Sequence, residues 1–462
     1  MSHTSHSKPS PAADPYTSSS HPPGPRPGRE RRSRGRVVGV DIARGIALLG
    51  MVTAHTIPFG EPVSWDPTTW GALVQGRSSI LFAVLAGVSV ALMTGGTAGV
   101  FGDRLREART RLLVRAVLIF ALGTALTIIS SQIAIVLQVY AVLLVAVLPL
   151  LRWSVRRLLV LACILAVVSP VVNVYGAYGI DVWGGQHGEV AALFVGGVYP
   201  AVVWLTFTVV GLLVGRLDLS SVWVAARLLL VGVLLAVVGY AAGWATDGGA
   251  GGRRSFRAGS SPSGATGSGE SKEVGFRLGT EPPDAGPPGT PVQGEDVDLS
   301  GRSCLRTPDD TIRCGALGDE TPFGEAEWER PGLEELLGAA PHSATTFEVL
   351  GSGGFALAVL ALCLLAPRGL RAVLYPVRAV GTVPLTLYVA HVVFFEVVGD
   401  RLGDHDREMF LAQAVVALAF ASLWSRWRGQ GPVEQLIATV ARRTAETAPA
   451  DRPAAQPGRP VG

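Results

Sequence analysis

Two histidines inside apolar stretches are the residues of this chain best suited to acid–base chemistry. His55 and His391 each lie within a long apolar stretch, whereas the other six of the eight histidines fall in the N-terminal tail or in hydrophilic connections. Imidazole titrates near neutral pH and can take a proton from a hydroxyl or an amine. An ionisable group at membrane depth is costly and marks a functional site by default. The alternative for each is a packing histidine bonded to a backbone carbonyl.

Charged residues lie within the His55 stretch and just before the apolar stretch that follows it. Asp41 and Arg44 are three residues apart, so they share a helix face as an ion pair, which could anchor the helix or offer Arg44 to a phosphate. Arg77 precedes the second apolar stretch on the side where arginine is scarce. We therefore expect Arg77 to have a partner, with Glu61, Asp66 and a substrate group as candidates.

The elements that carry these residues are expected to be membrane-spanning helices. The chain is 48% hydrophobic with a mean hydropathy of +0.38. Its apolar residues fall in blocks of roughly 18–23, enough to cross a bilayer as a helix. The sequence predicts an all-α polytopic bundle of about ten spans: Val37–Pro58, Ser78–Thr97, Leu112–Ser130, Gln132–Leu151, Leu158–Tyr175, Val190–Leu212, Val222–Trp244, Thr345–Leu365, Val377–Val398 and Glu408–Trp427.

The distribution of arginine predicts the orientation of the bundle. Basic residues cluster after every second span: Arg104, Arg106, Arg109, Arg111 and Arg115; Arg152, Arg156 and Arg157; Arg216 and Arg227; Arg368, Arg371 and Arg378; Arg426 and Arg428. Cytoplasmic connections carry this excess, so both termini are expected in the cytoplasm. His55 then lies ~25 Å and His391 ~20 Å from the inner ends of their helices, in the outer half of the bilayer.

Three hydrophilic segments complete the predicted organisation. Residues 1–35 are expected to form a disordered cytoplasmic tail, residues 245–344 a largely disordered, acidic insert outside the cytoplasm, and residues 431–462 a cytoplasmic tail. The insert carries Cys304 and Cys314 on the oxidising side of the membrane, which favours a disulfide over two free thiols.

Several function classes lack their sequence signatures. The chain has no Walker loop, G-x-G-x-x-G, H-E-x-x-H or C-x-x-C pattern, which argues against an ATP-driven pump, a metalloprotease and a redox protein. We expect no metal and no nucleic-acid partner. A proton-coupled transporter or flippase using paired histidines stays open, as does a non-catalytic scaffold that binds through its insert.

The stretch from Arg36 to His55 resembles the R-x-x-x-x-D-x-x-R-G-x-A opening of the transmembrane acyltransferase superfamily. That group includes the heparan-alpha-glucosaminide N-acetyltransferase-like proteins and bacterial membrane proteins of the DUF418 type. Val380–Tyr388 and Leu423–Glu434 also resemble the DUF418 type. The three pieces bracket nearly the whole membrane part, although the hydrophilic insert is not part of that pattern.

The resemblance implies an enzyme of the bacterial plasma membrane. It would move an acyl group, most simply acetyl from acetyl-CoA, to an extracytoplasmic acceptor such as an envelope sugar, with a histidine as base or acyl carrier. His55 matches the histidine that related O-acyltransferases place at the outer end of the first span. In the lysosomal N-acetyltransferase that residue lies in the first outer loop, which here has no histidine.

The expected site residues follow from this mechanism. His55 and His391 would be catalytic, since thioester transfer needs a base together with donors for the oxyanion. Acceptor and oxyanion contacts would come from Arg77, Glu61 and Tyr388, and contacts to CoA phosphates from Asp41, Arg44, Arg111 and Arg115. The partners would be the lipid bilayer, an acyl donor and an acceptor; an oligomer stays open.

Overall fold

The computed structural model describes the membrane part of the chain and several of its connections. Described are residues 37–56, 74–130, 133–184, 189–249, 302–306, 312–316, 331–402 and 406–447. The predicted tail 1–35, Glu61 and most of the insert lie outside these residues. The domain boundaries of the sequence analysis therefore stay predictions.

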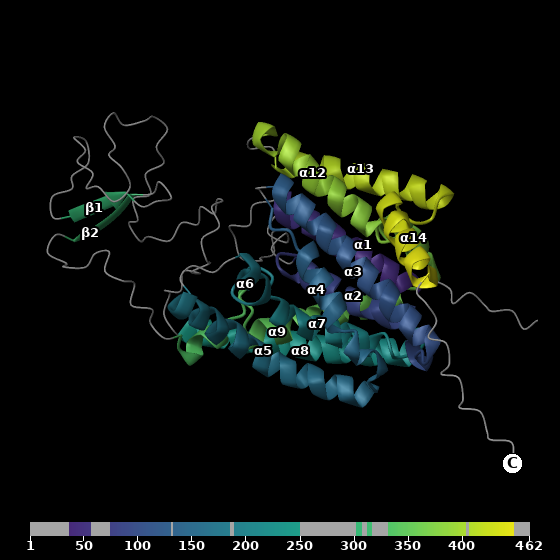
Figure 1. The fold of residues 1–462 in the computed structure, drawn as a ribbon, viewed down its shortest axis with the longest axis horizontal. Coiled ribbons are helices and arrows are strands. Elements are labelled where there is room, and N and C mark those ends of the chain that lie inside the picture. Colours follow the sequence, from purple (N-terminus) through teal and green to yellow (C-terminus); the bar gives the residue numbers. More distant parts are fainter. Residues whose placement is uncertain are drawn as a thin grey trace, which may run out of the picture. The chain divides into compact units, whose positions relative to one another are not determined.

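Helices make up nearly all of the described structure (Figure 1). In chain order they are α1 (Val38–Thr56), α2 (Arg77–Met93), η2 (Gly96–Ala98), α3 (Asp103–Ile129), α4 (Leu137–Ala146), η3 (Pro149–Arg152), α5 (Val155–Gly184), α6 (Glu189–Phe194), α7 (Ala201–Val214), α8 (Val222–Gly249), η4 (Leu333–Leu336), α9 (Thr346–Leu365), α10 (Arg368–Val373), α11 (Tyr375–Val380), α12 (Pro384–Leu402), α13 (Asp406–Trp427) and α14 (Pro432–Thr447).

Six of these helices are long and apolar enough to cross a membrane: α1, α3, α5, α8, α9 and α13. Four shorter apolar helices, α2, α4, α7 and α12, accompany them. Apolar side chains face outward on α8, where Leu230, Leu234 and Val237 are at least 60% exposed. These features confirm a polytopic helical membrane protein. The count of ten spans and the orientation remain predictions.

Proline divides three of the predicted spans. The predicted span Val190–Leu212 is broken into α6 and α7, and Pro200 is the residue before α7. The predicted span Val377–Val398 is broken into α11 and α12, and α12 begins at Pro384. The fourth predicted span is a ten-residue helix followed by a 3-10 turn that begins at Pro149. Proline has no backbone N–H and clashes with the preceding turn, so it begins helices and interrupts them.

Glycines let α1 lie backbone to backbone against its neighbours near Asp41. A Cβ added to Gly45 would lie 1.9 Å from the Val377 carbonyl oxygen of α11. One added to Gly381 would lie 1.8 Å from the Asp41 carbonyl oxygen. Only glycine permits such an approach, so these residues fix α11 and the start of α12 beside α1.

The C-terminal segment holds an ordered helix, where the sequence analysis places a tail. Helix α14 packs against α3, and its Glu434 caps the start of α12. The Glu434 carboxylate accepts hydrogen bonds from the Leu385 and Thr386 backbone N–H groups at 2.6 and 3.1 Å, and another from the Thr386 hydroxyl. A carboxylate suits this place because the first N–H groups of a helix lack partners within it.

Two short strands form a hairpin within the insert. β1 (Arg302–Arg306) pairs antiparallel with β2 (Ile312–Ala316), and Cys304 lies directly opposite Cys314 in the register. This register favours the predicted disulfide, which itself stays a prediction. Of the cysteines in described helices, Cys163 and Cys363 are free thiols. Cys363 is buried as a packing residue, whereas Cys163 is exposed on the surface of α5.

Candidate functional site

Helices α1, α12 and α13 bring the two membrane histidines together with a glutamine. His55 Nδ1 lies 3.0 Å from His391 Nε2, and His391 Nδ1 lies 2.8 Å from Gln413 Oε1. The two imidazole rings are nearly parallel, at 13° with centroids 5.3 Å apart. His391 is buried, whereas His55 is half-buried. The sequence left open whether the two histidines meet; the packing of α1 against α12 and α13 joins them.

The orientation of the Gln413 amide sets the direction of these hydrogen bonds. With Oε1 toward His391, the amide oxygen accepts and the proton of His391 lies on Nδ1. His391 Nε2 then has a lone pair and accepts from His55 Nδ1–H. His55 Nε2 is left as the free acceptor of the chain, with no hydrogen-bond partner among the described residues. A neutral imidazole with an oriented lone pair is the form that a general base needs.

Gln413 is a residue that the sequence analysis did not single out. Its signal was present, because it is an uncharged polar side chain in the apolar stretch of α13. Such residues usually bond between helices, and sequence does not tell which helix face they occupy.

Arg77, at the start of α2, contacts α8 and α9. Its Nε donates to the Tyr240 hydroxyl at 2.5 Å, and its guanidinium lies 4.7 Å from the centre of the same ring. Tyr240 in turn shares a 2.9 Å hydrogen bond with Ser352. The expected partner Glu61 lies outside the described residues. The Arg77 guanidinium is therefore stabilised in part by a cation–π interaction with the Tyr240 ring.

Tyr388 lies on α12, one turn before His391. It is buried, and its hydroxyl accepts a 3.4 Å hydrogen bond from the Val136 backbone N–H at the start of α4. This contact ties α12 to α4. The expected role of Tyr388 in oxyanion binding stays a prediction.

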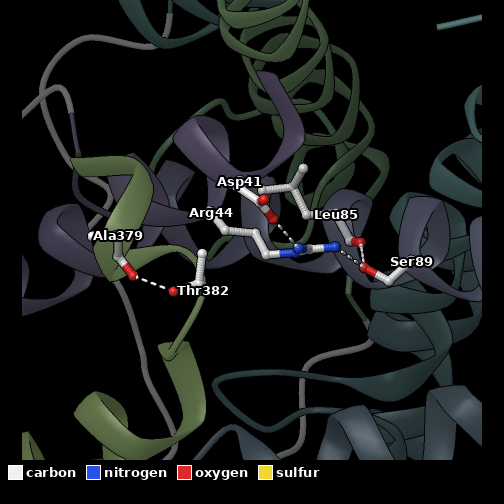
Figure 2. A network of polar contacts seen from close by, with 6 residues as sticks. All are labelled: Asp41, Arg44, Leu85, Ser89, Ala379 and Thr382. Carbon is white, nitrogen blue, oxygen red and sulfur yellow. Dashed lines mark hydrogen bonds and ion pairs between the residues drawn. The ribbon is translucent and has the colours of Figure 1, made fainter. Parts of the chain in front are cut away.

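The Asp41–Arg44 pair forms as its spacing predicts. Arg44 Nη1 lies 2.8 Å from Asp41 Oδ1, and Nη2 donates to the Ser89 hydroxyl of α2 at 2.7 Å (Figure 2). The Asp41 side chain is 3% exposed and that of Arg44 19%. Figure 2 also shows Thr382, in the break between α11 and α12, beside this network. Arg44 therefore keeps a small exposed fraction at the Asp41 end of α1.

The two α3 arginines expected on the CoA side have separate contacts. Arg111 forms an ion pair with Glu107 one turn earlier on its own helix. Arg115 donates a hydrogen bond to the Met93 sulfur at 3.6 Å. It also interacts electrostatically with the Glu434 carboxylate. Their role toward CoA phosphates stays a prediction.

A third histidine, His342, packs against aromatic side chains. His342 lies in the turn before α9, next to Tyr199 and Trp204, with ring centroids 5.4 and 6.4 Å away. Burial lowers the pKa of His342 to about 4, so the ring is neutral at neutral pH. In the sequence this residue falls in a hydrophilic connection, where the local pattern gives no sign of its burial.

Comparison with known proteins supports one family. Residues 36–244, which run from the start of α1 through most of α8, match the family described as Heparan-alpha-glucosaminide N-acetyltransferase, catalytic. No curated protein matches the chain. The matched part holds His55, Arg44 and Arg77, while His391 and Gln413 come from the part of the chain after the match. Over residues 36–244, a little under half of its length, the chain is thus similar to the catalytic part of a heparan-alpha-glucosaminide N-acetyltransferase.

Proposed function

We propose that the protein transfers an acetyl group from cytoplasmic acetyl-CoA to an acceptor on the other side of the membrane, with His55 as the general base. The observation that carries the proposal is the line Gln413–His391–His55, which leaves a lone pair on His55 Nε2. The similarity of residues 36–244 to the catalytic part of an N-acetyltransferase family supports the same reaction.

The reaction needs one proton to move twice. His55 Nε2 takes the proton from a hydroxyl or neutral amine of the acceptor while its oxygen or nitrogen attacks the thioester carbon. The C–S bond then breaks, and the CoA thiolate leaves and receives that proton from the imidazolium. His391 and Gln413 stabilise the imidazolium, because each accepts a hydrogen bond that strengthens as positive charge develops.

The two ends of α1 fit the two substrates. Arg44 lies 11 positions before His55, about 16 Å along the helix. An extended thioester arm whose phosphates meet Arg44 could therefore reach toward His55. With the orientation predicted by the arginines, the donor enters from the cytoplasm of a bacterial plasma membrane. The acceptor, which we take to be an envelope sugar, meets His55 on the opposite side.

The direct test is the release of CoA by the full chain purified in detergent. We expect release from acetyl-CoA that depends on an added acceptor such as D-glucosamine, and a loss of about 10²–10⁴-fold in the His55→Ala variant. Thr53→Ala is the matched control, because the Thr53 hydroxyl bonds to the Leu49 carbonyl of its own helix. Full activity in His55→Ala would overturn the assignment of the base.

Donor binding can be tested separately from turnover. The thermal midpoint of the wild type should rise with acetyl-CoA and rise less with a desphospho analogue, since binding to the folded state stabilises it. No rise with either donor, together with uptake driven by a proton gradient, would favour the transporter instead. The histidine pair would then serve proton coupling.

A further inference from the structure

Two stretches of the sequence that carry motifs, Val380–Tyr388 and Leu423–Glu434, meet at the start of α12. The Thr386 hydroxyl donates to a Glu434 oxygen at 2.5 Å and accepts from the Val433 backbone N–H at 3.3 Å. The start of α14 and the start of α12 are therefore bonded to each other. The proposed reaction does not use the side chains that make this contact.

Glu434 also binds the first backbone groups of α12. The helix begins at Pro384, which has no N–H, so Leu385 and Thr386 carry the first N–H groups that lack a partner inside the helix. Both donate to one Glu434 oxygen, at 2.6 and 3.1 Å, while the other oxygen accepts from the Thr386 hydroxyl. One carboxylate of α14 thus satisfies both donors at the start of the helix that carries His391.

No helix leads straight into α12, so its orientation depends on contacts with its neighbours. Helix α11 ends at Val380, and residues 381–383 separate it from α12. A continuous helix would fix α12 through its own backbone hydrogen bonds, whereas the break interrupts them. The close approach of Gly381 to α1 fixes where α12 begins. Side-chain contacts are left to fix the rotation of α12 about its own axis.

Those side-chain contacts lie on two sides of α12. With 3.6 residues per turn, Thr386 faces one side, while Tyr388 and His391 face roughly the other. Glu434 holds the Thr386 side, and Gln413 of α13 holds the His391 ring at 2.8 Å. Thr386 lies five positions before His391, about 7.5 Å along the helix. Loss of the Glu434 contact should therefore change the place and the direction of the His391 ring.

Helix α14 is in turn fixed to α13, the helix that supplies Gln413. The Gln430 carbonyl, in the turn between the two helices, accepts from Trp424 Nε1 at 2.8 Å and from Gln435 Nε2 at 2.7 Å. Helices α12 and α13 are thus joined twice: through α14 at one end, and through the His391–Gln413 hydrogen bond farther along. The first connection can set the geometry of the second.

We propose that Glu434 is a positioning residue for the acetyl transfer, and that through α12 it holds the His391 ring where that ring accepts the proton of His55 Nδ1. The inference rests on the proposed function, because the base of that reaction is the group whose tautomer is set. Glu434 acts through α12 and not on a substrate. Helix α14, at the C-terminal end of the described chain, thereby becomes part of what makes His55 a base.

The test is a double-mutant cycle on CoA release by the purified full chain, with acetyl-CoA and D-glucosamine. Glu434→Ala removes the acceptors at the start of α12, and we expect kcat to fall about tenfold, because a small displacement of a catalytic group is costly. In the His391→Phe background the same change should lower kcat by less than about twofold, since the residue through which it acts is gone. Equal losses in both backgrounds would overturn the inference.

Two milder variants separate positioning from folding. Glu434→Gln keeps an oxygen that accepts from the two N–H groups, so it should retain most of the wild-type kcat. Thr386→Val removes only the hydroxyl and takes the place of Glu434→Ala in the cycle if that variant does not fold. We expect a smaller loss of kcat in Thr386→Val, and this loss should again disappear in the His391→Phe background.

The matched control is a helix cap on an element without a residue of the line Gln413–His391–His55. Thr345 caps α9 by accepting from the Glu348 N–H at 3.3 Å. Thr345→Ala should lower the thermal midpoint as a lost cap does, and it should change kcat by the same small factor in both backgrounds. A loss that depends on His391 in Thr345→Ala would mean that the cycle reports general loosening, which would overturn the inference.

Failure of the proposed reaction gives a different result. If the wild type releases no CoA, nitrogen NMR of isotope-labelled histidine decides the positioning role, because the two ring nitrogens are distinct and report the tautomer. The His55 and His391 signals are identified by their loss in His55→Ala and His391→Phe. These signals should change in Glu434→Ala and stay unchanged in Thr345→Ala. Unchanged signals in Glu434→Ala would overturn the inference.

Discussion

The two ends of α1 use polar residues in opposite ways. At the Asp41 end, a full charge pair bonds to itself and to Ser89, and glycines seal the helix backbone against α11. At the His55 end, the hydrogen bonds that run from Gln413 through His391 to His55 leave His55 Nε2 as an unused acceptor. At the Asp41 end the polar groups are used to hold helices together. At the His55 end one lone pair is not used in the fold, and for this reason the proposed chemistry is placed there.

Replacing His391 should have the largest effect on turnover and would sharpen this contrast. The His391→Phe variant keeps an aromatic ring but breaks the line between Gln413 and His55. We expect acetyl transfer to fall about 10²-fold, within the range for general-base catalysis, because the tautomer of His55 is no longer set. CoA release measured beside the thermal midpoint checks this. An unchanged rate would mean that the line only packs helices.

Replacing Asp41 should give the reverse pattern. Asp41→Asn leaves Arg44 without its buried counter-charge, so the free energy of unfolding should fall by up to about 3 kcal/mol, since one partner of a mostly buried pair is lost. Transfer per folded molecule should change less than in His391→Phe.

The chain offers a matched control for this substitution. Asp103 and Arg106 have the same spacing, but their side chains are 90% and 56% exposed. Asp103→Asn should therefore leave the thermal midpoint nearly unchanged. Equal losses in Asp41→Asn and Asp103→Asn would contradict the structural role of the Asp41 pair.

Gln413 tests the direction of the proton line more finely. Gln413→Glu supplies an oxygen acceptor in the same place, so His391 keeps its proton on Nδ1 and transfer should persist. Gln413→Leu removes the acceptor, and we expect a loss of about tenfold, the lower range for a residue that orients another. Both variants are measured by kcat with saturating acetyl-CoA. A loss of activity in Gln413→Glu but not in Gln413→Leu would mean that Gln413 donates the hydrogen bond to His391 instead of accepting it.

The cysteine pair carries the smallest expected effect on activity but tests which end of α1 faces outward. Helix α8 leads into the insert, and its Tyr240 contacts Arg77 at the start of α2. A Cys304–Cys314 disulfide formed in intact cells, detected by mass before and after reduction, would place that end on the oxidising side. Cys304→Ser should leave transfer unchanged. Fully reduced cysteines in intact cells would count against the predicted orientation.

Much of the architecture is predictable from the sequence because its causes are local. Apolar blocks of membrane length predict the helices, since the hydrocarbon core requires backbone hydrogen bonds within each segment. The i, i+3 spacing of Asp41 and Arg44 predicts their ion pair, which the structure contains. The motif from Arg36 to His55 predicts the family that residues 36–244 resemble. The helix breaks at Pro200 and Pro384 are also marked in the sequence by the prolines themselves. The apolar residues continue on both sides of each proline, so hydropathy predicts one uninterrupted span there.

Which of the candidate residues lie together is decided only by tertiary structure. Hydropathy gives the depth of a residue but not the face of the helix it occupies, so His55, His391 and Gln413 could be joined only by the packing of α1, α12 and α13. His342 shows the limit most clearly: it lies in a hydrophilic connection, and its burial depends on Trp204, Tyr199 and Glu348, residues of other segments or of the helix that follows. The positions of membrane spans follow from the bilayer, which requires apolar helical segments of a given length. The composition of a site depends on contacts between segments that are distant in sequence.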